Sequence, residues 1–192
     1  MLKKIQYNSP VILTFSLVSL AALLLGEFTG GISTALLFSV YRASLRDPFT
    51  WFRFLGHVLG HAGYEHFLSN MTLLLVIGPP LEERYGGKAL LECMAATALI
   101  SGVLQFALFP DSALLGASGI VFMLIILSSI SGASDGRIPL TLILVYLIYV
   151  GGEVVTGLTQ ADNVSQLTHI VGGTCGGIFG LMMRRGTKSR KK

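Results

Sequence analysis

The feature that most constrains this chain is a series of apolar segments separated by polar or charged turns. Of its 192 residues, 52% are hydrophobic and only 12% are charged, a balance far from that of soluble domains. A helix needs about 20 mainly apolar residues to cross a bilayer, and several segments approach that length. Because helices satisfy their own backbone hydrogen bonds in lipid, the sequence predicts an all-α integral membrane protein.

The apolar segments predict six spans in a single domain that covers residues 1–192. The spans are expected over Val11–Gly26, His66–Ile77, Ala89–Pro110, Ser118–Ile130, Ile138–Val155 and Val164–Met183. Gly78-Pro79-Pro80 is expected to end the second span, since proline disrupts a helix interior. We found no repeat or domain boundary.

A long first loop follows the first span, from Glu27 to Glu65. It holds too many aromatic residues for a solvated linker, and we expect short amphipathic helices at the membrane interface over Leu36–Tyr41 and Phe52–Leu59. The net positive charge comes largely from the chain ends, with Lys3 and Lys4 at the N-terminus and the basic tail 184–192 at the C-terminus. Because these basic residues lie at the two ends of the chain, they do not suggest a surface that binds nucleic acid. They predict cytoplasmic termini, in agreement with an even number of spans in the plasma or inner membrane.

Gly116-Ala117-Ser118-Gly119 stands where a polar loop turns into the short fourth span. At about 1.5 Å per residue this helix is roughly 20 Å long, shorter than the roughly 30 Å of hydrocarbon. If the helix ends at the cytoplasmic surface, Ser118 lies on the order of 10 Å below the outer one. Free backbone N–H groups at a helix start can stabilise an oxyanion, so the motif offers a nucleophile. The alternative is a small residue that serves helix packing.

His169 lies about five residues inside the sixth span, or roughly 7 Å deep, in the layer predicted for Ser118. An ionisable side chain at that depth is costly and marks a functional candidate. Gly172 and Gly176 recur at a four-residue spacing and permit close approach to the fourth helix. A serine and a neutral histidine in contact are a nucleophile and its general base.

His66 and Asn70 are four residues apart and share one helix face. Both donate hydrogen bonds, so with the backbone N–H of Ser118 they form a candidate oxyanion hole. The alternative for Asn70 is a polar contact between membrane helices.

Three other sets of polar residues receive weaker interpretations. His57 and His61 have the spacing of a metal pair, but no glutamate follows His57 as the metalloprotease motif requires, so neither metal nor cofactor is expected. Cys93 and Cys175 are interpreted as packing residues. The role of Glu153 in the fifth span stays open between an interfacial contact, an arginine partner and a part in function.

Taken together, these motifs resemble the rhomboid family of intramembrane serine proteases. The resemblance runs from about residue 51 to 180 and includes the Glu-x-Arg-x-Gly turn at Glu82, Arg84 and Gly86. It implies a six-helix bundle whose short central fourth helix carries the serine, and a first loop partly embedded in the membrane. It also implies a Ser118–His169 dyad, an oxyanion hole from His66 and Asn70, supporting residues at Gly116, Gly119, Phe122, Gly172 and Gly176, and cleavage of single-span membrane proteins. The fifth span and the following loop would serve as gate and cap.

Two positions depart from the family pattern. Trp51 stands one residue earlier than usual, so that Phe52 precedes Arg53, and Phe122 occupies the place of a tyrosine that commonly stacks under the histidine. Phenylalanine keeps the stacking face and loses the hydroxyl.

Two other functions compete with a protease that acts on transmembrane substrates. A rhomboid-like protein that binds membrane helices without cutting them is disfavoured because both dyad residues are present. A small transporter is disfavoured because no inverted repeat is found. Substrate identity and oligomeric state are not predicted.

Overall fold

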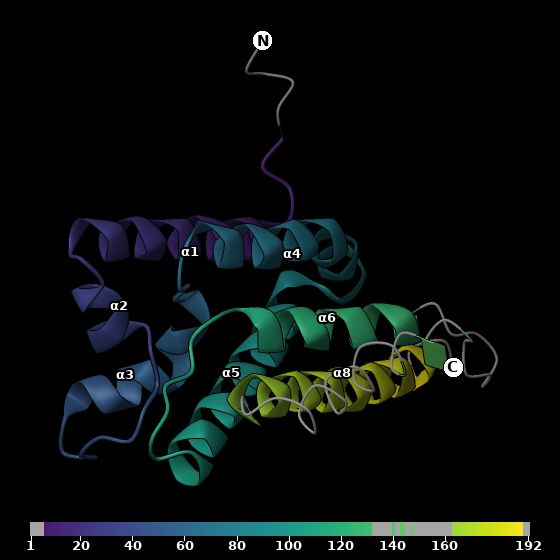
Figure 1. The fold of residues 1–192 in the computed structure, drawn as a ribbon. Helices are drawn as coiled ribbons and strands as arrows, with labels where there is room; N and C mark the ends of the chain where they lie inside the picture. The colour runs from purple at the N-terminus through teal and green to yellow at the C-terminus, as the bar shows by residue number, and fades with distance from the viewer. Residues whose placement is uncertain (1–5, 132–139, 141–142, 145–146, 148–162, 190–192) are drawn as a thin grey trace.

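The computed structural model describes residues 6–131, 140, 143–144, 147 and 163–189. Its secondary structure in these ranges is helical, and the only extended pairing there is an isolated antiparallel bridge between Val40 and Leu114. Figure 1 shows α1 (Pro10–Phe28), α2 (Ile32–Leu37), α3 (Pro48–Gly56), α4 (Tyr64–Tyr85), α5 (Gly87–Leu108), α6 (Ser118–Ser131) and α8 (Asn163–Ser189); a 3₁₀ turn, η2, covers His57–Leu59. Most of the predicted fifth span and Glu153 lie outside the described residues.

Two described helices, α1 and α5, are long and apolar enough to cross a membrane. The apolar stretches Ser118–Ser131 and Leu167–Met183 are shorter. The starts of α1, α5, α6 and α8 fall within two residues of the predicted starts of the first, third, fourth and sixth spans. An all-helical fold is therefore confirmed for the described residues, whereas the count of six spans stays a prediction.

The predicted end of the second span is wrong, because α4 continues through Pro79 and Pro80 to Tyr85. Membrane helices tolerate proline where neighbouring groups satisfy the freed backbone. The added turns carry Glu82, which is 5% exposed and whose carboxylate accepts hydrogen bonds from the backbone N–H groups of Val11 and Ile12, each at 3.0 Å. These N–H groups belong to the first turn of α1 and have no partner within that helix. The end of α4 thus caps the start of α1.

The helix predicted over Leu36–Tyr41 is also wrong in its bounds. The observed helix α2 ends at Leu37, and the chain then leaves the helix, so that Val40 exchanges two 2.9 Å hydrogen bonds with Leu114. This tertiary pairing competes with helix formation at residues 38–41. The second predicted interfacial helix overlaps α3 and η2.

Arg53 organises the first loop from inside. It is 1% exposed and donates to Leu36 O, the Tyr41 hydroxyl, Thr50 Oγ1 and Asp47 Oδ2 at 2.9–3.1 Å. Its guanidinium also lies 4.5 Å from the centre of the Tyr41 ring. A buried charge is stable only when it is paired and hydrogen-bonded, so this arginine draws α2, the following turn and α3 together.

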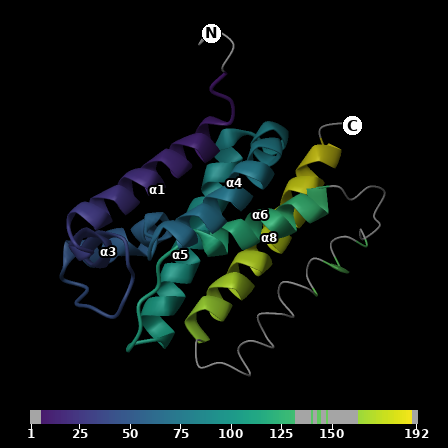
Figure 2. The same cartoon turned by 45° about the horizontal axis from the view of Figure 1, so that its top comes forward.

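Helix α6 is the central helix, and ten of its apolar or glycine residues are buried. It lies beside α8, which runs in the same direction (Figure 2). Later residues of α8 contact later residues of α6, as parallel helices require: Gly172 meets Gly119, Gly176 meets Met123, and Gly180 meets Ile130. Small residues on α8 therefore let the two backbones approach closely.

Candidate active site

The segment that leads into α6 is held on both sides by the first loop. Leu114 pairs with Val40, and the N–H of Gly116 donates to the carbonyl of His57 at 2.9 Å. Gly116 has a φ of 123°, in a region that side chains other than glycine rarely adopt. The first helical residue after this turn is Ser118. The first N–H groups of a helix have no partner within it, so the serine lies beside backbone donors.

His66 lies against this turn. A Cβ atom at Gly116 would be 2.8 Å from both Nε2 and Cε1 of His66 and 4.0 Å from the amide nitrogen of Asn70. Gly116 is therefore required both by its backbone angle and by the space that His66 occupies. The structure places His66 and Asn70 next to the Gly116–Ser118 turn.

A backbone contact determines which nitrogen of His66 carries the proton. The N–H of Ala62 donates to His66 Nδ1 at 3.3 Å, so Nδ1 is the acceptor and the neutral ring is protonated at Nε2. Nε2 is the nitrogen that faces Gly116. His66 thus presents a hydrogen-bond donor toward the turn that carries Ser118.

Asn70 is 5% exposed, and its amide donates to the carbonyl of His66 at 3.1 Å. Its side chain has a second N–H and an acceptor oxygen. The observed bond joins two residues of α4. It therefore does not decide between an oxyanion role for Asn70 and a contact of Asn70 with another helix.

His169 stacks flat on Phe122. Their ring centres are 4.1 Å apart and their planes differ by 5°. Ser118 and Phe122 are four residues apart on α6, so their side chains share one helix face. Neighbouring residues of α8 meet the same turn: a Cβ atom at Gly119 would lie 2.8 Å from Thr168 Cγ2, and one at Gly172 would meet the carbonyl of Gly119. The structure therefore brings His169 to the turn of α6 that begins at Ser118.

Sequence reasoning missed a set of buried polar groups behind this turn. Ser101 and Gln105 of α5 are 3% and 1% exposed, and Ser101 Oγ would lie 3.6 Å from a Cβ atom at Gly119. The available signal was Thr97, Ser101 and Gln105 at four-residue spacing in the part of α5 that carries no charge. Polar atoms thus border the start of α6 on the α5 side as well.

The two other histidines of the first loop bind backbone rather than each other. His57 Nδ1 lies 3.1 Å from Arg53 O, and His61 Nδ1 lies 3.2 Å from Leu59 O. Burial lowers the pKa of each imidazole to about 4, so both are neutral at pH 7. Among the described residues, no three His, Cys, Asp or Glu side chains gather as for a metal ion. Cys93 and Cys175 are buried free thiols, as expected for packing residues.

Comparison with known proteins assigns most of the chain to a family. Residues 48–186 match the Rhomboid domain, which is more than half of the chain. The chain belongs to the rhomboid family. Family membership and the long apolar helices α1 and α5 together make it an integral membrane protein.

Individual relatives are distant. The chain is 30% identical over 140 residues to Rhomboid-related protein 1 of Caenorhabditis elegans, which covers 68% of this chain and 39% of that protein. It is 25% identical over 140 residues to "Putative rhomboid protease YdcA" of Bacillus subtilis, covering 67% of this chain and 65% of the relative. A third relative, Rhomboid-related protein 2 of Mus musculus, is 34% identical over 73 residues, 38% of this chain and 24% of the mouse protein. The chain thus spans less than two thirds of each relative's length.

Proposed function

We propose that this rhomboid is an intramembrane serine endopeptidase that uses Ser118 as nucleophile and His169 as general base. The observation that carries the proposal is the flat stack of His169 on Phe122 at 4.1 Å, one helical turn from Ser118 on the same face of α6. A histidine whose ring plane is held by packing is oriented to accept a proton from a neighbouring hydroxyl.

The proposed reaction proceeds through an acyl-enzyme. Ser118 Oγ attacks the carbonyl carbon of the scissile peptide while His169 accepts the hydroxyl proton, and the carbonyl oxygen becomes an oxyanion. Collapse expels the amine, which takes the proton from His169. Water then attacks the ester with His169 again as base, and Ser118 is released with its proton.

The donors around the turn fit the oxyanion that forms. His66 Nε2 faces Gly116, the Asn70 amide lies close by, and the Ser118 N–H stands at the start of α6. Preorganised donors of these kinds stabilise tetrahedral intermediates of acyl transfer. Removing one of several such donors costs roughly 10²–10³ in turnover.

We propose that the substrates are single-span membrane proteins. A substrate helix must unwind locally before its peptide carbonyl can be attacked, because that carbonyl is hydrogen-bonded within the helix. Small or helix-breaking residues near the outer interface are therefore expected at the cleavage site. Neither a cofactor nor a nucleic acid takes part in the proposed reaction.

Labelling with a fluorophosphonate probe tests the nucleophile directly. We expect the detergent-solubilised protein to be labelled and to cleave a single-span test substrate, and we expect Ser118→Ala to do neither. His169→Ala should abolish cleavage, since nucleophile and base act as a unit. Undiminished cleavage by either variant would contradict the dyad. Binding of the test substrate without cleavage by the wild-type protein would favour the non-proteolytic alternative.

A chelator provides a separate arm of the same experiment. Because no metal is proposed, EDTA should leave the cleavage rate unchanged. Loss of activity that zinc restores would instead make His57 and His61 candidate ligands.

Orientation in the membrane is proposed with both termini in the cytoplasm. The parallel direction of α6 and α8 (Figure 2) fits the proposed span count, because two spans that run the same way require an odd number of crossings between them. The choice of the cytoplasmic side rests on the basic chain ends. Cysteine-accessibility mapping should place Lys191 and Ser112 on opposite sides. Equal accessibility from one side would contradict both the span count and the depth inferred for Ser118.

A further inference from the structure

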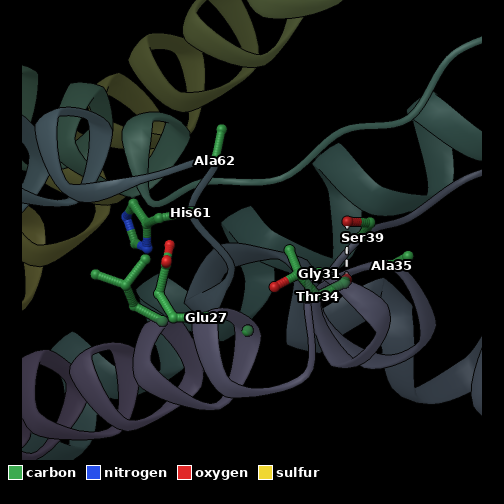
Figure 3. Close-up of a pocket in the computed structure, with 10 residues that line it drawn as sticks. Glu27, Gly31, Thr34, Ala35, Ser39, His61 and Ala62 are labelled. Carbon is green, nitrogen blue, oxygen red and sulfur yellow. Dashed lines mark hydrogen bonds between the residues drawn. The ribbon is translucent and has the colours of Figure 1, made fainter.

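A pocket of about 340 Å³ lies beside the end of α1, between α2 and the turn at residues 60–63. Figure 3 shows the labelled residues that line it: Glu27, Gly31, Thr34, Ala35, Ser39, His61 and Ala62. None of these residues belongs to the proposed dyad or oxyanion hole. Two of them, His61 and Ala62, nevertheless contact His66.

His61 and Ala62 together hold the His66 ring. The His61 and His66 ring centres are 5.1 Å apart at an interplanar angle of 67°, an edge-to-face contact. The Ala62 N–H donates to His66 Nδ1 at 3.3 Å. One neighbour limits rotation of the ring and the other selects its tautomer, so the turn at 60–63 aims Nε2 at Gly116.

His61 is itself only partly satisfied. Its Nδ1 lies 3.2 Å from the Leu59 carbonyl, which can only accept, so Nδ1 carries the proton and Nε2 offers a lone pair. The residue is 3% exposed, and Nε2 is buried without a hydrogen-bond partner in the part of the chain that the structure describes. A buried polar nitrogen without a partner is costly, which points to a donor that enters from the pocket.

Glu27 supplies the second group of this pocket. Its side chain extends from α1 toward the His61 ring (Figure 3). A carboxylate and an imidazole lone pair are both acceptors, and a water molecule that donates one hydrogen to each satisfies both. At about 30 Å³ per water, the pocket has ample room for such a bridge.

We propose that His61 is a positioning residue for His66, and that Glu27 holds His61 through water in this pocket. This inference rests on the proposed function, in which His66 Nε2 donates to the oxyanion. It couples the outer end of α1 to the oxyanion hole through two side chains that do not touch the substrate.

Nitrogen-15 NMR of histidine-labelled protein tests the positioning step without any catalysis. The His66 signals, assigned by their loss in His66→Gln, should show a protonated Nε2 and an unprotonated Nδ1 in the wild type. In His61→Ala we expect a second tautomer or exchange-broadened His66 signals. Unchanged His66 signals in a folded His61→Ala protein would overturn the proposal.

Kinetics tests the link to Glu27. We expect His61→Ala to lower kcat about 10-fold, with KM within about twofold of wild type, because the donor is misaligned while substrate binding is retained. His61→Phe keeps a ring against His66 and loses both nitrogens, and Glu27→Ala leaves the ring and removes the carboxylate. His61→Phe and Glu27→Ala should each lower kcat about threefold. The variant that combines these two substitutions should be no slower than either single one. Multiplicative effects would overturn the link between the two residues.

Ser39→Ala is the matched control, because Ser39 lines the same pocket but donates its hydroxyl to the Thr34 carbonyl at 2.9 Å. It should retain wild-type kcat. Melting temperatures of all variants separate a folding defect from a loss of turnover per folded molecule, and a wild-type kcat in folded His61→Ala would also overturn the proposal. If fluorophosphonate fails to label wild-type Ser118, the protease assignment fails, and the His66 signals alone then decide the positioning step.

Discussion

Gly172 of α8 lies directly against the carbonyl oxygen of Gly119 in α6, so close that a Cβ atom at position 172 would overlap it. Gly119 immediately follows Ser118, and Gly172 is three residues beyond His169. The close approach of two backbones at this point is what brings the proposed base to the proposed nucleophile.

We therefore expect Gly172→Ala to push α8 away from α6 and to reduce cleavage at least 10-fold. Overpacking of this kind typically costs about 1–3 kcal/mol, so the melting temperature should fall as well. Gly177→Ala is the control, because nothing lies within 4 Å of a Cβ atom at that position. Equal activity of the two alanine variants would show that close packing at Gly172 is not needed.

The stack of His169 on Phe122 predicts a graded response at position 122. Aromatic stacking contributes about 0.5–1.5 kcal/mol beyond burial, so Phe122→Leu should lower kcat roughly 2- to 10-fold. Phe122→Tyr keeps the flat face and should stay within about twofold of wild type. Rates are measured per active site titrated with the fluorophosphonate probe, and a leucine variant as fast as the tyrosine variant would remove the ring from the mechanism.

Asn70→Ala separates an oxyanion role from a structural one. An oxyanion donor predicts a loss in turnover of roughly 10²-fold, the lower end of the range for a single donor, because the His66 and Ser118 donors remain. Ser118 should still react with the probe. A helix contact predicts instead a loss of stability on the order of 1 kcal/mol with turnover per folded molecule preserved. Ser69→Ala is the matched control, because Ser69 also donates to the His66 carbonyl, at 3.0 Å, from an exposed position.

Glu82→Ala should destabilise the protein by leaving two N–H groups at the start of α1 without their acceptor. Losing the partner of a buried polar group costs about 1–3 kcal/mol, and fluorescence-detected melting of the detergent-solubilised protein measures it. Glu83→Ala changes the same charge at an exposed neighbour and should leave the melting temperature within error. A similar fall in melting temperature in both variants would mean that the change of charge, and not the missing acceptor, causes the effect.

The buried His57 predicts weaker folding in acid. Its side chain is completely buried, and burial lowers its pKa from 6.5 to about 4, so the unfolded chain binds the proton more tightly. The stability contribution is fully present above pH 6.5 and declines as the pH falls toward 4. Between pH 7.5 and 5.5 the loss is on the order of 1 kcal/mol from this group.

His57→Asn gives the corresponding control, since asparagine can donate to the Arg53 carbonyl as Nδ1 does but does not titrate. Its melting temperature should depend less steeply on pH than that of the wild type. Identical slopes would mean that His57 does not contribute to the acid sensitivity.

The lengths of the apolar segments were enough to predict where several helices begin. The starts of α1, α5, α6 and α8 could be predicted because a helix in lipid must satisfy its own backbone, so long apolar runs allow few alternatives. Local chemistry also predicted Ser118 at the start of α6, since a glycine-rich turn precedes an apolar run. The four-residue spacing of His66 and Asn70 was likewise sufficient to place them on one helix face.

Tertiary structure decided what local signals could not. Pro79 and Pro80 lie inside α4, because Glu82 beyond them binds the first turn of α1. Helix α2 ends at Leu37, and the residues beyond it leave the helix because Val40 pairs with Leu114, 74 positions along the chain. The stack of His169 on Phe122, the aim of His66 Nε2 at Gly116, and the contact of Ala62 with His66 all depend on how separate segments pack. Sequence patterns report the environment along one segment, whereas a catalytic arrangement requires distances between segments, and only packing sets those distances.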